Sequence, residues 1–126
     1  RLVRLARRRD VSLSASVSDI AACYGVADIA VVPIRSGSGT RIKLIEAAAY
    51  GVPAVSTTIG AEGTAFRHGR DLLLADATDS FTGACIDLLV HREHAVRLGR
   101  RARITAVQNY DAVRWRRHLL GLVTNR

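Results

Sequence analysis

The sequence lacks any long hydrophobic run and contains no methionine at all. Its longest apolar stretch, residues 42–49, is interrupted by Lys43 and Glu46, so nothing approaches the ~20 apolar residues of a membrane-spanning helix. Residues 1–9 carry charge throughout and have no apolar core of the kind found in signal peptides. We therefore expect a cytoplasmic protein whose sequence, as given, begins within the last turns of a helix of a longer chain.

Cysteine is also scarce, with only Cys23 and Cys85 among 126 residues. The two are far apart and do not have the spacing of metal ligands. They are predicted to be free, buried thiols in a reducing compartment, and no metal is expected.

The charge is strongly one-sided, with 19 basic residues against 11 acidic ones and a net charge of +8. Lys43 is the only lysine; an arginine bias of this kind reflects genome composition, which makes the one retained lysine of interest. A basic face on the last two predicted helices indicates either a solvated surface or weak contact with an anionic membrane. A nucleic-acid partner is disfavoured, since no binding motif is present and aromatic residues make up only 5%. The basic residues concerned are Arg97, Arg100, Arg101, Arg103, Arg114, Arg116 and Arg117.

Short bursts of β-branched and aliphatic residues alternate with helix-like stretches along the chain. This alternation predicts one α/β domain, a Rossmann-like parallel sheet with helices on both faces. Asp19 and Asp76 are predicted helix caps, and Gly51 is predicted to end a helix. The strand at 28–33 is expected to be buried on both faces. Strands are predicted at 11–15, 28–33, 53–57 and 71–75, and helices at 19–24, 40–50, 78–90, 93–109 and 111–123.

Residues 31–46 read as a strand, a glycine-rich loop and a helix. In an open parallel sheet, ligands bind beyond the carboxyl ends of the strands, where this loop is expected to lie. Gly37 and Gly39 permit backbone conformations that let a ligand approach the main chain. The amino terminus of the following helix then suits a phosphate group.

Basic side chains are concentrated around the start of the same helix, at Arg35, Arg41 and Lys43. A cation at an exposed helix amino terminus is unfavourable by roughly 0.3–1 kcal/mol. A bound anion would reverse that sign, and a pyrophosphate fits. The alternative is a solvated loop with scattered charges.

Glu46 lies among apolar residues on a helix that is hydrophobic almost all round, which predicts a well-buried carboxylate. Burying a carboxylate is costly unless it is paired or hydrogen-bonded. Helical spacing places Glu46 on one face with Gly39, Lys43 and Tyr50. It could accept hydrogen bonds from ribose hydroxyls, or it could pair with Lys43 in a bond worth ~0.2–0.5 kcal/mol.

The segment from Pro33 to Thr57 resembles the signature of the group 1 glycosyltransferases, in the branch that carries Gly-Ser-Gly-Thr-Arg at residues 37–41. The resemblance continues through Gly-Ala-Glu-Gly at 60–63 and Asp-Leu-Leu-Leu-Ala-Asp at 71–76. It implies half of a GT-B fold of two Rossmann-like domains. Residues 1–126 would be the donor-binding domain, incomplete at its amino end and without the acceptor-binding domain.

The resemblance also implies an activity, the transfer of a sugar from a nucleoside-diphosphate sugar (UDP- or GDP-linked), with retention and without a cofactor or catalytic metal. Glu46 takes the place of the glutamate that binds the donor ribose, whereas the family's first glutamate is replaced by Ser38, so sugar contacts would come from the loop backbone. The acceptor would be a glycan, a lipid or a small molecule held by the other domain. Because catalysis needs the cleft between domains, residues 1–126 alone are expected to be inactive, and no catalytic residue is assigned. The expected donor-binding residues are Gly37, Ser38, Gly39, Thr40, Arg41, Lys43 and Glu46.

Two other functions stay open at this point: a sugar-nucleotide epimerase of the same fold, and a non-catalytic nucleotide-binding module. Glu62 follows a predicted strand and could reach the cleft. Phe81 and Trp115 are expected to pack in the core or between domains. The histidines, none of them near the glycine loop in sequence, are not assigned to the site, and a solvated surface is expected for the second and third; they are His68, His91, His94 and His118.

Overall fold

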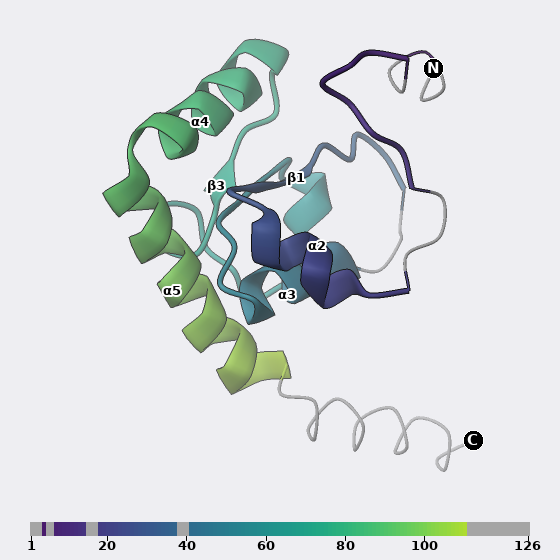
Figure 1. Cartoon of the computed structure of the whole chain (residues 1–126). Helices are drawn as coiled ribbons and strands as arrows, with labels where there is room; N and C mark the ends of the chain where they lie inside the picture. Colours follow the sequence, from purple (N-terminus) through teal and green to yellow (C-terminus); the bar gives the residue numbers. More distant parts are fainter. Residues whose placement is uncertain (1–3, 5–6, 15–17, 38–40, 111–126) are drawn as a thin grey trace, which may run out of the picture.

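The computed structural model describes residues 4, 7–14, 18–37 and 41–110 (Figure 1). The predicted helix at 111–123, with Trp115, His118 and three of the arginines, lies outside the described residues. The elements, in chain order, are α2 (Ile20–Val26), β1 (Ala30–Val32), α3 (Ile42–Ala49), β2 (Ala54–Ser56), the 3₁₀ turn η1 (Ile59–Ala61), β3 (Leu73–Leu74), α4 (Thr78–Val90) and α5 (Arg92–Tyr110).

The three strands form one parallel sheet in the order β1-β2-β3. Ala30 is in register with Ala54, and Val55 with Leu73. Helix α3 connects β1 to β2, while β2 is connected to β3 by η1 and a loop. The α/β class with a parallel sheet is therefore confirmed.

Alternating residues of the central strand β2 enter two separate cores. Ala54 packs with Leu44 of α3, whereas Val55 packs with Leu88 of α4. Helix α5 serves both cores, through Ala102 in the first and Leu98 in the second. In Figure 1, α4 lies on one side of the sheet and α2 and α3 lie on the other, while α5 extends from the end of α4 past α3, so helices cover both faces as predicted.

Gly51 ends α3, as the sequence predicts. Its φ of 71° is in the left-handed region that glycine adopts most readily. Gly51 N donates to Ala48 O at 2.9 Å, and Val52 N donates to Ala47 O at 2.9 Å, which is a Schellman motif. Helix α5 can approach this turn closely because its residue Gly99 has no side chain. A Cβ added at Gly99 would lie only 2.2 Å from Gly51 O.

The predicted strands are longer than the observed ones, and one is wrong. Residues 11–14 form no strand; no described strand lies beside them, and Leu13 is 54% exposed. The expectation that 28–33 is buried on both faces is also wrong. Val31 is 49% exposed, because β1 is an edge strand of the described sheet. A strand's length depends on its neighbours, which the local pattern does not reveal.

The two aspartates predicted to cap helices differ in what they do. Asp19 caps α2, where its Oδ1 accepts from Ala22 N at 3.3 Å. Asp76 does not cap α4, which begins after Ala77 without a side-chain cap. Instead Asp76 accepts from Thr58 N at 2.8 Å and from Thr58 Oγ1 at 2.7 Å, so it fastens the loop after β2 to the loop after β3.

Both cysteines are free thiols, as predicted, but only one is substantially covered. Cys85 is half-buried beside the core that contains Leu88, and burial raises the pKa of its thiol. Cys23 is exposed, because α2 has no fully buried residue. The expectation of a buried thiol is therefore wrong for Cys23.

Candidate functional site

The glycine-rich loop leaves β1 at the carboxyl edge of the sheet and leads directly into α3. Gly37 has a φ of 115°, a conformation that side chains other than glycine's rarely adopt. Ser38, Gly39 and Thr40 lie outside the described residues. Arg41 is the N-cap of α3 and makes no side-chain capping bond, so the first backbone N–H groups of α3 are not capped by its side chain.

Arg41 and Glu62 bring together the loops that follow two neighbouring strands. The Arg41 side chain is only 10% exposed, and its Nη2 lies 3.9 Å from Glu62 Oε2. Glu62 follows η1 after β2, and its side chain is 74% exposed. Glu62, which the sequence predicts could reach the cleft, therefore lies beside Arg41 at the start of α3. An ion pair this open to solvent is worth only ~0–1 kcal/mol.

The other two basic residues predicted around the start of α3 are Arg35, which is hydrogen-bonded to α4, and Lys43, which is exposed to solvent. Arg35 Nη2 donates to Thr78 Oγ1 at 3.2 Å, at the start of α4. Lys43 is exposed. The start of α4 also lies at the carboxyl edge of the sheet, because α4 follows β3. Arg35 thus stays at this edge, attached to α4 as well as to the loop that follows β1.

Glu46 is half-buried rather than fully buried, and it is hydrogen-bonded to a tyrosine. Tyr24 Oη donates to Glu46 Oε2 at 3.1 Å. Burial, the hydrogen bond to Glu46 and the charge of Glu46 raise the pKa of Tyr24 to about 12. The ion pairs of the described residues do not include Lys43 with Glu46, so the pairing considered from the sequence is not formed. Sequence reasoning missed Tyr24.

A rigid turn after β2 supports the loop that follows β1. Gly60 N donates to Thr57 Oγ1 at 3.0 Å, and that hydroxyl in turn donates to Ile34 O. A Cβ at Gly60 would lie 2.4 Å from Ser56 Oγ and 3.1 Å from Val32 O, so a larger residue there would have to displace the Ser56 side chain. These contacts fix the exit of β1, immediately before Arg35, against the exit of β2.

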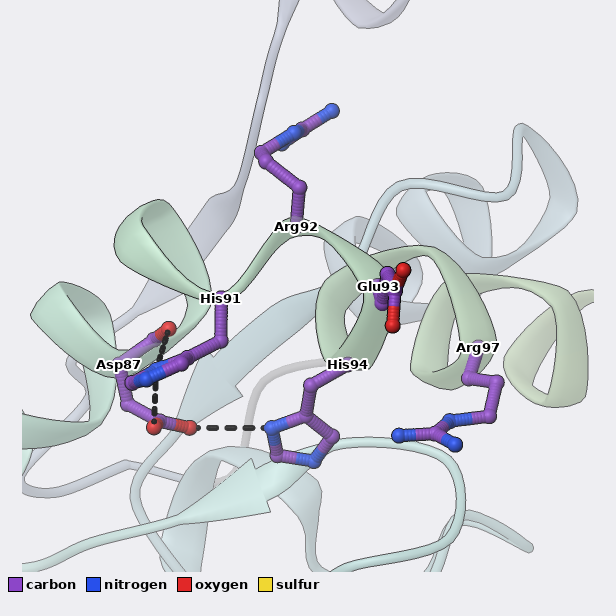
Figure 2. Close-up of a pocket in the computed structure, with 6 residues that line it drawn as sticks. All are labelled: Asp87, His91, Arg92, Glu93, His94 and Arg97. Atoms are coloured by element: carbon purple, nitrogen blue, oxygen red, sulfur yellow. Dashed lines mark hydrogen bonds and ion pairs between the residues drawn. The ribbon is translucent and has the colours of Figure 1, made fainter.

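A separate pocket lies where α4 meets α5 (Figure 2). His91 Nδ1 lies 3.0 Å from Asp87 Oδ1, and His94 Nδ1 lies 3.0 Å from Asp87 Oδ2. The surface position expected for His91 agrees with its 64% exposed side chain, whereas His94 is only 36% exposed. His94 is therefore partly buried against Asp87 rather than fully solvated. Figure 2 shows Arg97 on the same side of α5 as His94.

This histidine pocket is remote from the glycine-rich loop. It lies at the carboxyl end of α4, whereas Arg35 contacts the amino end. The 13 residues of α4 separate the two ends by roughly 20 Å. His68 also lies outside the glycine-rich loop. Its Nδ1 accepts a hydrogen bond from Leu74 N at 2.9 Å, which holds β3 in place. None of the three described histidines contributes to the site around Glu46.

Neither a cluster of metal ligands nor a membrane-spanning helix occurs in the described part of the chain. No group of three or more histidine, cysteine, aspartate or glutamate side chains there is arranged to hold a metal ion. No described helix is long and apolar enough to cross a membrane. Phe81 packs against the core that contains Leu88, as the sequence predicts.

A parallel sheet with a glycine-rich loop at its carboxyl edge, followed by a helix that carries a largely buried arginine and a hydrogen-bonded glutamate, defines a Rossmann-like α/β domain. Comparison with known families identifies the family within this fold class. Residues 1–91 match the model of the family described as "Glycosyl transferases group 1". The chain therefore belongs to the group 1 glycosyl transferases.

Two curated relatives show how the chain compares with longer proteins. It is 27% identical over 108 residues to the GDP-mannose-dependent alpha-(1-6)-phosphatidylinositol monomannoside mannosyltransferase of Mycobacterium tuberculosis, a match that covers 78% of this chain and 28% of the relative. It is 35% identical over 63 residues to an uncharacterized 44.6 kDa protein in the cps region of Klebsiella pneumoniae, covering 50% of this chain and 16% of that protein. The chain thus spans less than a third of either relative.

Proposed function

We propose that this chain is the donor-binding domain of a glycosyltransferase and binds a nucleoside-diphosphate sugar. The observation that carries the proposal is the state of Glu46, on the helix that follows the glycine-rich loop. Its Oε2 accepts from Tyr24, while its Oε1 has no hydrogen bond to any residue that the structure describes. A half-buried carboxylate with one oxygen engaged has acceptor capacity left for the hydroxyls of a ribose.

The diphosphate would lie at the start of α3. The first N–H groups of α3, which the Arg41 side chain does not cap, and the helix dipole favour an anion. Arg41 adds a charge that is largely withdrawn from water, which strengthens its interaction with a phosphate. We propose that these groups compensate the leaving diphosphate without a metal, and that transfer proceeds with retention. Gly37 to Thr40 would contact the phosphates and sugar through the backbone, and Lys43 would supply further positive charge.

Calorimetric titration of the full-length chain with GDP, UDP and ADP tests the donor site directly. We expect one nucleotide to bind preferentially and its affinity to fall at least about tenfold in Glu46→Ala, since hydrogen bonds to a charged group are worth roughly 1.5–3 kcal/mol. Glu93→Ala, at an exposed carboxylate on α5, is the matched control and should bind like the wild type. Equal affinity for wild type and Glu46→Ala would reject the ribose site.

The donor sugar can be examined by comparing a nucleotide with its sugar conjugate. The mycobacterial relative is named as GDP-mannose-dependent, which supports GDP and GDP-mannose as the first pair to test. A transferase should bind and consume the conjugate in the presence of an acceptor. A sugar-nucleotide epimerase would release an epimerised sugar without an acceptor, and a non-catalytic module would gain no affinity from the sugar.

The exposed face of α5 supports a second, peripheral role. Three aliphatic side chains there are exposed, Val96 by 41%, Ile104 by 58% and Val107 by 54%. Arginines lie between them, which combines apolar insertion with attraction to anionic lipid. We propose weak contact of this face with an anionic membrane, close to a lipid acceptor. The exposed arginines are Arg97, Arg100, Arg101 and Arg103.

Vesicle flotation tests this membrane contact. The protein should bind vesicles that contain phosphatidylglycerol at low salt and be released as salt rises, since the Debye length falls to about 3 Å at 1 M. Ile104→Ser with Arg100→Ser should weaken binding, while vesicles of phosphatidylcholine alone should bind neither protein. Failure to bind anionic vesicles at low salt would eliminate the proposed contact.

A further inference from the structure

Tyr24 joins two helices at the residue that we place against the donor ribose. Its hydroxyl lies 3.1 Å from Glu46 Oε2 and 3.4 Å from Lys43 O, both on α3. Its ring is stacked on Tyr50, with centroids 5.2 Å apart and planes inclined by 13°. Tyr24 is therefore held by its ring and by its hydroxyl at once, beside one oxygen of Glu46.

We propose that Tyr24 is a positioning residue, which fixes the Glu46 carboxylate so that its other oxygen faces the ribose hydroxyls of the donor. The inference rests on the proposed donor site. A glutamate side chain has several rotatable bonds, and the freedom it retains in the unbound protein must be lost when a ligand binds. A hydrogen bond formed before binding removes part of that loss, so the carboxylate is pre-organised.

The ring of Tyr24 makes the hydroxyl a suitable anchor. A stacked aromatic pair is worth about 0.5–1.5 kcal/mol beyond the area it buries, so Tyr50 restrains the Tyr24 ring. The pKa of Tyr24 is raised to about 12, so the phenol keeps its proton and remains a donor throughout the neutral range. A carboxylate that already accepts a bond from a phenol can still accept from a ligand through Oε1.

A purely structural role for Tyr24 makes a different prediction, since its ring and its hydroxyl, which is shared between Glu46 Oε2 and Lys43 O, also hold α2 on α3. Loss of such a clamp would disturb the whole site and would weaken every nucleotide. Loss of positioning at Glu46 would weaken only ligands that have ribose hydroxyls. The two roles are therefore distinguished by which ligands bind more weakly, and not by how much affinity is lost.

The test uses the full-length chain with Tyr24→Phe, which keeps the ring and its stacking. Binding is measured by calorimetry for whichever of GDP, UDP and ADP binds most tightly, and for its 2′,3′-dideoxy analogue. We expect Tyr24→Phe to weaken the ribonucleotide by about fivefold to tenfold, less than the loss of a direct hydrogen bond between the ligand and a charged group, and to leave the dideoxy analogue unchanged. Added to Glu46→Ala, the substitution should produce no further loss.

Tyr110→Phe is the matched control, because Tyr110 Oη accepts from Ala65 N at 2.9 Å, away from Glu46. It should lower the stability of the fold without changing the preference for the ribonucleotide. Equal weakening of both ligands by Tyr24→Phe would overturn the positioning role. Loss of ribonucleotide binding in Glu46→Ala but not in Tyr24→Phe would overturn this inference alone. No loss in Glu46→Ala would overturn the donor site and the inference together.

Discussion

Thr105 and Asp71 are 34 residues apart in the chain, yet Thr105 Oγ1 donates a 2.8 Å hydrogen bond to Asp71 Oδ1. The other carboxylate oxygen of Asp71 accepts from Arg67 N at 2.9 Å and from Arg70 Nη2 at 2.7 Å. Asp71 is only 1% exposed, so both of its oxygens are satisfied within the protein. The carboxylate fastens the turn before β3 to α5.

Thr105→Val should destabilise the fold by about 1–3 kcal/mol. Valine has nearly the same shape as threonine but leaves one oxygen of a buried carboxylate without its donor, which costs the desolvation penalty of that group. Urea unfolding followed by circular dichroism measures the change. Thr82→Val, on the exposed side of α4, is the control and should stay within about 0.5 kcal/mol of the wild type. Equal effects at the two positions would contradict a special role for the bond to Asp71.

Stability should fall in acid, below about pH 4. Burial raises the pKa of Asp71, but hydrogen bonds from Arg70, Arg67 and Thr105 and the charge of Arg70 outweigh it, so the pKa lies below the ordinary 3.8. The bonds from Thr58 lower the pKa of Asp76 in the same direction. A carboxyl group whose pKa is lower in the folded state contributes stability above its unfolded pKa, and loses it as pH falls through the folded pKa. Urea unfolding from pH 7 to pH 3 should show this loss, with a smaller slope in Asp71→Asn.

The helices were predictable from the sequence because their signals are local. Gly51 ends α3 at the predicted position, and α4 has the predicted bounds, 78–90. The strands were less predictable, since each owes its length to the strand beside it. Val31 looks like a core residue in the sequence but lies on an edge strand. Asp76 looks like a cap because the local pattern does not show that Thr58, 18 residues earlier, folds back onto it.

The part of the candidate site that is contiguous in the sequence was predictable. Arg41 and Glu46 belong to one loop and helix, so motif and helical spacing identify both. Tyr24 lies 22 residues before Glu46, on a different helix, and only the packing of α2 on α3 brings its hydroxyl to the carboxylate. Arg35 was predicted beside the start of α3, and only the structure reveals its bond to Thr78, 43 residues away. Tertiary contacts of this kind leave no local pattern.

Gly99→Ala should destabilise the protein although the substitution lies within a helix. Alanine is the better helix former by about 1 kcal/mol, but its Cβ at position 99 would lie 2.2 Å from Gly51 O. That contact forces α5 away from the end of α3, and overpacking typically costs about 1–3 kcal/mol. We expect a net loss of stability in thermal unfolding.

Gly83→Ala is the matched control for this contact. Gly83 lies within α4, and a Cβ there would meet nothing within 4 Å. The same chemical change should therefore stabilise the protein by up to about 1 kcal/mol, through helix propensity alone. The opposite signs expected at positions 99 and 83 make the pair informative. A gain of stability in both variants would show that α5 can move away from Gly51 at little cost.

Glu62→Gln should strengthen nucleotide binding, whereas Arg41→Ala should weaken it. In the unbound protein the Glu62 carboxylate lies 3.9 Å from Arg41 Nη2, so it competes with a diphosphate for the same guanidinium. Because Glu62 is 74% exposed, the competing attraction is weak, and its removal should increase affinity only about twofold to threefold. Calorimetry at two salt concentrations measures the gain, which should shrink as salt screens the pair. Weaker binding in Glu62→Gln would instead mean that Glu62 itself contacts the ligand, and the phosphate site would have to be redrawn around both residues.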